Sequence, residues 1–161
     1  PLSNPADPRR QLVGVGTRAL GPLGAQALAL RGLERALIIH SDDGLDEISP
    51  AATTHGWLIA EGGVTERDFG PGDFGLPMHA LSSVAGGDAQ QNAGDILAIL
   101  DGAEGPKTDF VVMNAAAALW VAGRTDDFAA GVRLAREAIG SGRARDVLNH
   151  YVSLSQELAD G

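Results

Sequence analysis

Four carboxylates stand close together at the end of a predicted strand. The segment Asp42-Asp43-Gly44-Leu45-Asp46-Glu47, here named the acidic loop, follows the apolar run 36–39. In open α/β sheets, ligands bind beyond the carboxyl ends of the strands. Hard carboxylate oxygens on such a loop suit Mg²⁺, particularly Mg²⁺ that also holds a phosphorylated substrate. The acidic loop is therefore the candidate site for chemistry.

A solvated acidic turn is the competing interpretation, since carboxylates are mostly exposed in proteins. An EF-hand is excluded, because Glu47 stands where that loop needs glycine and Thr53 where it needs glutamate. We interpret His40, at the end of the strand, as structural rather than as a ligand or a base. The hydroxyl residues show no His/Asp arrangement for covalent catalysis. The other histidines have no partner at metal-ligand spacing: His55, His79 and His150.

Composition narrows the class of protein. The 161 residues are enough for a single domain, 1–161, and an apolar content of 44% indicates a globular chain. A net charge of −9 argues against a nucleic-acid footprint and against an anionic membrane surface. No apolar run approaches the length of a membrane span. The chain lacks cysteine, so we expect a reducing compartment, the cytoplasm.

The first part of the chain has the pattern of a βαβ unit. A short buried strand is predicted over 11–16, a helix over 18–31 and a second strand over 35–39. Short connections of this kind make the two strands parallel. The pattern then changes to two β-prone runs, 55–60 and 64–69, around a glycine-containing turn, which predicts an antiparallel hairpin near 53–69.

The last third is predicted to be helical. After an ordered loop over 70–78, Asp88 can cap a helix that runs through Leu100, and Pro106 can open the next helix, which Gly123 ends. Two further helices are predicted over 126–139 and 143–158. The fold class is therefore α/β: a mainly parallel sheet with flanking helices, an antiparallel hairpin and a helical C-terminal third.

Several short motifs, in this order, resemble one family. They are Pro1-Leu2-Ser3-Asn4-Pro5-Ala6, Asp43-Gly44-Leu45-Asp46-Glu47, Asp73-Phe74-Gly75-Leu76-Pro77, Gly86-Gly87-Asp88-Ala89 and Asn114-Ala115-Ala116-Ala117-Ala118-Leu119. Each is weak alone, but the ordered set resembles the C-terminal part of anthranilate phosphoribosyltransferase, across essentially the whole chain. The resemblance implies most of the catalytic large α/β domain, which has the nucleoside phosphorylase/phosphoribosyltransferase-like fold.

The resemblance implies a reaction and its participants. The family transfers the 5-phosphoribosyl group from phosphoribosyl diphosphate to the amine of anthranilate, in tryptophan biosynthesis. Asp46 and Glu47 match the family's Mg²⁺-binding pair, as ligands directly or through water in the complete enzyme. We expect Asp43 to orient the loop or cap a turn, and Asp42 to be solvated. The complete enzyme is expected to be a homodimer.

Other parts of the family's site have no match in this chain. The N-terminal helical domain, the glycine-rich diphosphate loop, a Lys-His-Gly-Asn stretch and the arginine that meets anthranilate are missing, and the sequence opens at Pro1. We therefore expect a C-terminal part of the enzyme that is inactive alone. Two alternatives stay open: a nucleoside phosphorylase of the same broad fold, and a non-catalytic relative that binds nucleic acid, which a salt-dependent DNA-binding assay would detect.

Overall fold

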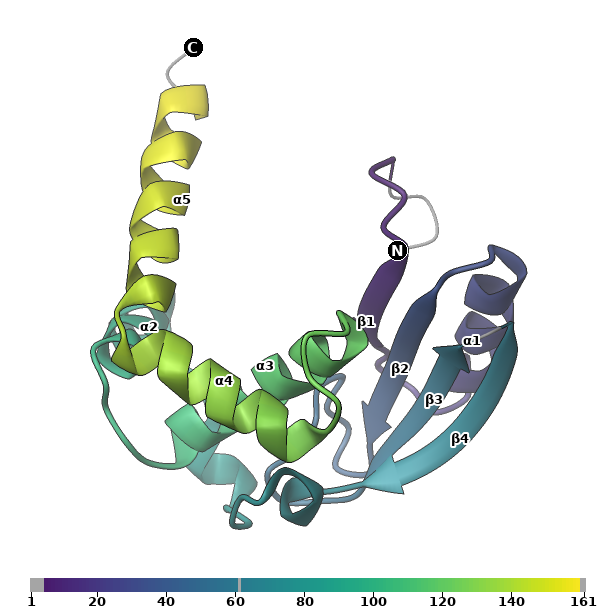
Figure 1. Cartoon of the computed structure of the whole chain (residues 1–161). Helices are drawn as coiled ribbons and strands as arrows, with labels where there is room; N and C mark the ends of the chain where they lie inside the picture. The colour runs from purple at the N-terminus through teal and green to yellow at the C-terminus, as the bar shows by residue number, and fades with distance from the viewer. Residues whose placement is uncertain (1–4, 61, 160–161) are drawn as a thin grey trace.

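The computed structural model describes residues 5–60 and 62–159, and these form a sheet with helices on both of its faces (Figure 1). The strands are β1 (Arg10–Gly14), β2 (Arg35–Ser41), β3 (Thr54–Ala60) and β4 (Gly63–Phe69). The α-helices are α1 (Leu20–Leu30), α2 (Ala89–Leu100), α3 (Pro106–Val121), α4 (Phe128–Gly140) and α5 (Arg143–Ala159). Two short 3-10 helices, η1 (Pro71–Phe74) and η2 (Leu81–Val84), lie between β4 and α2.

The strands lie in the order β1-β2-β3-β4. Strand β1 pairs with β2 in parallel, with Gly14 opposite Ile39, so the predicted βαβ unit is confirmed. Strands β3 and β4 form the predicted antiparallel hairpin, in which Ala60 stands opposite Gly63. Strand β3 also pairs with β2 in the antiparallel sense. The expectation of a mainly parallel sheet is thus only partly confirmed, because one of the three pairings between the described strands is parallel.

The alternation of side chains along β2 divides the core into two parts. Ala36 and Ile38 pack with residues of α1 and with Trp57 of β3. Leu37 and Ile39 point to the other face and pack against α3 and α4. This is the period of two that a strand buried on both faces requires. The middle of β2 is therefore packed from both faces of the sheet.

The helical part begins and ends where the sequence chemistry dictates. The Asp88 carboxylate accepts a hydrogen bond from the Gln91 N–H and caps α2, as predicted, while Pro106 opens α3. Helix α4 begins at Phe128, two residues later than predicted, because the Asp127 carboxylate caps it through the Ala130 N–H at 2.6 Å. The predicted helix over 143–158 is α5.

Helix α5 extends away from the rest of the molecule, at the opposite end from the sheet (Figure 1). It buries none of its residues within the described part of the chain. Among the described residues, no helix combines the length and the hydropathy that crossing a membrane requires.

Candidate functional site

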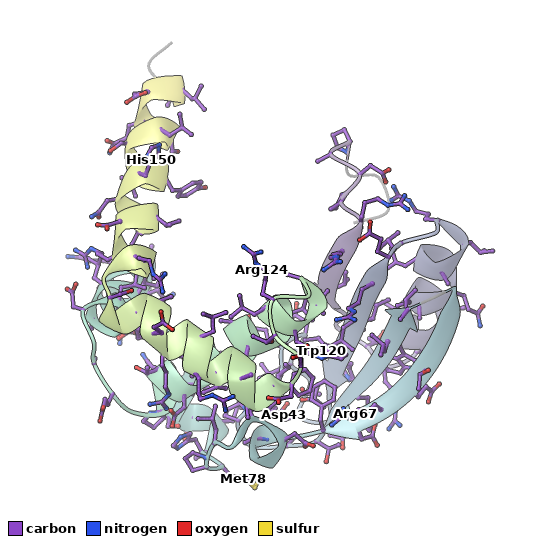
Figure 2. All side chains as sticks on the ribbon, viewed as in Figure 1. Asp43, Arg67, Met78, Trp120, Arg124 and His150 are labelled. Atoms are coloured by element: carbon purple, nitrogen blue, oxygen red, sulfur yellow. The ribbon has the colours of Figure 1, made fainter. Side chains whose placement is uncertain are left out.

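The acidic loop leaves β2 at the edge of the sheet where β1 also ends. Beyond β1, the Val15 N–H donates to the Ile39 carbonyl oxygen at 3.0 Å, and His40 Nδ1 donates to the Val15 carbonyl oxygen at 2.8 Å. The His40 ring is thereby engaged between the two strand ends, which fits its interpretation as a structural residue. Figure 2 shows Asp43 of the loop at the junction between the sheet and the helices.

Buried hydroxyl groups hold the backbone of the loop. Ser41 Oγ donates to the Glu47 carbonyl oxygen at 2.7 Å and lies 2.7 Å from Thr54 Oγ1. The Ser49 N–H donates to both of these hydroxyl oxygens, at 3.2 and 3.1 Å. Ser41, Ser49 and Thr54 are fully buried. Because buried polar groups need hydrogen-bond partners, this network fixes one loop conformation.

Asp43 is part of this support. Its Oδ2 accepts a hydrogen bond from Ser49 Oγ at 2.6 Å, and Ser49 Oγ in turn accepts from the N–H groups of Ala51 and Ala52. The Asp43 carboxylate therefore ties the start of the acidic loop to the turn that follows it. This contact fits the loop-orienting role expected for Asp43.

Asp42 differs from the expectation of a solvated carboxylate. Its side chain is half-exposed, but Oδ1 accepts a hydrogen bond from His55 Nε2 at 2.7 Å. His55 Nδ1 makes a second contact, of 2.7 Å, with Asp68 Oδ1 on β4. The sequence did not reveal this cluster, because both carboxylates lie 13 residues from the histidine and only the β2-β3-β4 pairing unites them.

The cluster favours a protonated His55. Burial alone would lower the pKa of His55, but the hydrogen bonds to Asp42 and Asp68 outweigh burial and raise its pKa. The hydrogen bond from His55 correspondingly lowers the pKa of Asp42. The buried His55 ring, in contact with both carboxylates, thus anchors the first residue of the acidic loop.

Asp46 and Glu47 line a pocket of about 420 Å³. The other residues around it are Leu12, Gly14, Ile39, Phe110, Val111 and Asn114. Desolvation raises the pKa of Glu47, and the negative charge of Asp46 raises it further. Among the described residues, neither carboxylate forms an ion pair with a basic side chain, so the pocket carries negative charge that a cation would neutralise.

The carboxylates of Asp46 and Glu47 suit one particular mode of Mg²⁺ binding. In the described part of the chain, no three His, Cys, Asp or Glu side chains gather closely enough to hold a metal ion. Mg²⁺ usually keeps several waters and is held by one or two carboxylates together with substrate phosphates, rather than by a closed protein cage. Two adjacent carboxylates in an open pocket therefore suit Mg²⁺ shared with a phosphorylated ligand.

Two further residues set the position of the loop, and sequence reasoning assigned neither of them a role. A Cβ atom at Gly14 would overlap the Asp46 carbonyl oxygen, so only glycine allows β1 to approach the loop this closely. Asn114 of α3 makes two hydrogen bonds with the backbone of Ile48, directly after Glu47. The signal for Asn114 was an amide side chain at the start of a run of four alanines.

Comparisons with known proteins match the chain over nearly its full length. It is 45% identical over 163 residues to the anthranilate phosphoribosyltransferase of Rubrobacter xylanophilus, an alignment that covers 99% of this chain and 47% of that protein. The enzyme of the same name from Desulfatibacillum aliphaticivorans is 45% identical over 157 residues, covering 98% of this chain and 46% of the relative. The chain thus spans about half the length of the curated relatives it matches.

Solved structures and a family model give the same picture. Anthranilate phosphoribosyltransferase from Saccharomyces cerevisiae in complex with PRPP and Mg matches with a TM-score of 0.81 and 30% identity, over 89% of this chain and 42% of that one. The same enzyme in complex with 4-fluoroanthranilate gives a TM-score of 0.82 and 29% identity, with equal coverage. The model of the glycosyl transferase family, a/b domain, matches residues 1–145. The chain therefore belongs to the glycosyl transferase family, a/b domain.

Proposed function

We propose that this chain is part of an anthranilate phosphoribosyltransferase, which moves the 5-phosphoribosyl group of phosphoribosyl diphosphate onto the amine of anthranilate and releases diphosphate. The observation that carries the proposal is the acidic loop, held rigidly at the carboxyl edge of the sheet with Asp46 and Glu47 on an open pocket. The names of the relatives, and the solved complexes with PRPP and Mg and with 4-fluoroanthranilate, support this choice of reaction.

In this proposal, Asp46 and Glu47 hold Mg²⁺ directly or through water. The bound Mg²⁺ supplies charge stabilisation for the leaving diphosphate. The rest of the loop keeps the two carboxylates in place before substrate arrives, so that little reorganisation accompanies the reaction. The amine of anthranilate is already a nucleophile and needs no strong base, which agrees with the engagement of the His40 ring by a backbone carbonyl.

The remainder of the site is proposed to lie in the portion of the relatives that these 161 residues do not match. That portion supplies the diphosphate-binding glycine-rich loop and the anthranilate pocket. In this view the chain is one domain, the C-terminal part of the catalytic α/β domain, within a homodimeric cytoplasmic enzyme. Since the family match covers residues 1–145, the described strands and helices α1 to α4 fall within that domain.

The test is formation of phosphoribosylanthranilate from phosphoribosyl diphosphate and anthranilate. We expect Mg²⁺-dependent turnover when the chain is fused to the remaining portion of an anthranilate phosphoribosyltransferase, a protein here called the joined enzyme. We expect no turnover with 1–161 alone. Loss of substrate positioning forfeits much of a proximity advantage of about 7–11 kcal/mol. No product from the joined enzyme would contradict the proposed reaction, whereas turnover by 1–161 alone would contradict only the need for the other portion.

A further inference from the structure

We propose that Asn114 is the positioning residue of the acidic loop. Its Oδ1 accepts a hydrogen bond from the Ile48 N–H at 2.9 Å, and its Nδ2 donates to the Ile48 carbonyl oxygen at 3.2 Å. One amide side chain thus satisfies both backbone groups of the residue that follows Glu47. The inference rests on the proposed function, because it assigns to Asn114 the orientation of the metal-binding pair.

The Glu47–Ile48 peptide group is held at both of its polar atoms. Its carbonyl oxygen, which belongs to Glu47, accepts from Ser41 Oγ at 2.7 Å, and its N–H, which belongs to Ile48, donates to Asn114 Oδ1. The first contact comes from the end of β2 and the second from α3. Hydrogen bonds at both atoms restrain rotation of this peptide plane, which also contains the Cα atom of Glu47, so the point from which the Glu47 side chain leaves the backbone is held in place.

Asn114 is itself held firmly enough to act in this way. Its Nδ2 also donates to the Phe110 carbonyl oxygen at 3.1 Å, one turn earlier in α3. The neighbouring Val112 and Met113 are buried in the core that α3 shares with β2, and Ile48 is fully buried in the same core. The two hydrogen bonds between Asn114 and Ile48, here called the loop clamp, therefore join two parts of one packed core. Asn114 also lines the same pocket as Asp46 and Glu47.

Removal of the side chain should loosen the loop without removing a ligand. In Asn114→Ala the Ile48 N–H and carbonyl lose their partner, and a part-buried backbone group without a partner favours rearrangement. Asn114→Ser separates the loop clamp from the helix contact. A serine hydroxyl can still donate to the carbonyl four residues earlier in a helix, but it is too short to replace both bonds to Ile48.

The first experiment measures amide hydrogen exchange at Ile48 in the joined enzyme, without metal or substrate. In both variants we expect exchange at least about 10-fold faster, the equivalent of one hydrogen bond. The second experiment measures the Mg²⁺ concentration for half-maximal rate at saturating phosphoribosyl diphosphate. Loss of a residue that orients a metal ligand typically costs about 10–100-fold in metal affinity or activity, so we expect an increase of at least about 10-fold.

Asn92→Ala is the matched control. Asn92 of α2 makes the same pair of bonds to a single residue, accepting from the Gly87 N–H at 2.8 Å and donating to the Gly87 carbonyl at 3.1 Å, at a loop away from the pocket. Its removal should change neither the Ile48 exchange rate nor the Mg²⁺ requirement.

Three results would decide the matter. If the wild-type joined enzyme makes product but the Ile48 amide exchanges no faster in Asn114→Ser than in the wild type, the inference is overturned and the proposed function stands. A turnover rate that falls by the same factor at every Mg²⁺ concentration in the Asn114 variants would also overturn the inference and leave the proposed function standing. If Ile48 exchanges faster in the variants but the wild-type joined enzyme makes no product, the result would support the loop clamp and contradict the proposed function.

Discussion

At the scale of residues, the side chains of the acidic loop divide into two groups. Asp46 and Glu47 face the pocket, whereas Asp42 and Asp43 accept hydrogen bonds from His55 and Ser49 and support the loop. The clustering of carboxylates was enough to select the acidic loop as the candidate site. It could not predict this division completely, because the direction of each side chain depends on partners that only the folded chain brings near.

The double variant Asp46→Asn, Glu47→Gln should separate function from stability. Both side chains are exposed, so the free energy of unfolding should change by less than about 0.5 kcal/mol. Turnover by the joined enzyme should fall by at least about 100-fold, because the amides bind Mg²⁺ poorly. Urea unfolding and Mg²⁺-dependent rates are the measurements.

The control for this variant is Glu104→Gln, Asp126→Asn, which removes the same charges at exposed positions outside the pocket. It should leave turnover and Mg²⁺ dependence unchanged. If the Asp46, Glu47 variant also kept its turnover and its Mg²⁺ dependence, the acidic loop would be a solvated turn.

His55 should contribute a pH-dependent part of the stability. Its folded-state pKa is raised, so its contribution is complete below its unfolded pKa and is lost as the pH rises through the folded pKa. His55→Ala should therefore lower the free energy of unfolding by about 1.5–3 kcal/mol near pH 5.5, the range for hydrogen bonds to charged groups. Urea unfolding near pH 5.5 and near pH 9 should show the difference shrinking at the higher pH.

His150→Ala is the comparison, since His150 is exposed on α5 (Figure 2) and is expected to change stability little at either pH. A stability penalty in His55→Ala that grows toward pH 9 would contradict the imidazolium anchor between Asp42 and Asp68.

At the scale of elements, the contact between β1 and the acidic loop needs a residue without a side chain. Gly14→Ala would place a Cβ atom on the Asp46 carbonyl oxygen, so either β1 or the loop must move. We expect a stability loss of about 1–3 kcal/mol, the usual cost of overpacking, together with a higher Mg²⁺ requirement. Thermal unfolding and Mg²⁺ titration of the rate measure the two effects.

Gly16→Ala tests whether any glycine replacement near this strand end would act in the same way. A Cβ atom at Gly16 would have open space around it, so stability and Mg²⁺ requirement should stay close to the wild-type values. Equal effects at Gly14 and Gly16 would show that the close approach to Asp46 is not the cause.

The sequence predicted these elements well where the signal was local. The βαβ unit and the hairpin follow from residue patterns within short windows, and both are confirmed. The antiparallel pairing of β2 with β3 has no such signal, because 12 residues of irregular structure join these strands. Strand β2 also continues to Ser41, beyond the predicted end at residue 39, because Ser41 is buried opposite Thr54. Polar side chains there looked like the end of a strand.

At the scale of the whole molecule, α5 presents an apolar stripe to its surroundings. Val147, Tyr151, Leu154 and Leu158 recur at the spacing of one helix face, with exposed fractions of 69%, 67%, 47% and 75%. Contiguous apolar surface of this kind usually marks an interface. It accords with a chain that spans about half the length of its relatives.

We therefore expect 1–161 alone to self-associate through this stripe, with an apparent mass that rises with protein concentration in sedimentation velocity. The double variant Val147→Glu, Leu158→Glu places two charges on the stripe and should restore the monomer, because burying an unpaired carboxylate is costly. Asn149→Glu with Gln156→Glu adds the same charge to the opposite face of α5 and should not restore it. A wild-type chain that stays monomeric, or equal rescue by both double variants, would show that the stripe does not drive association.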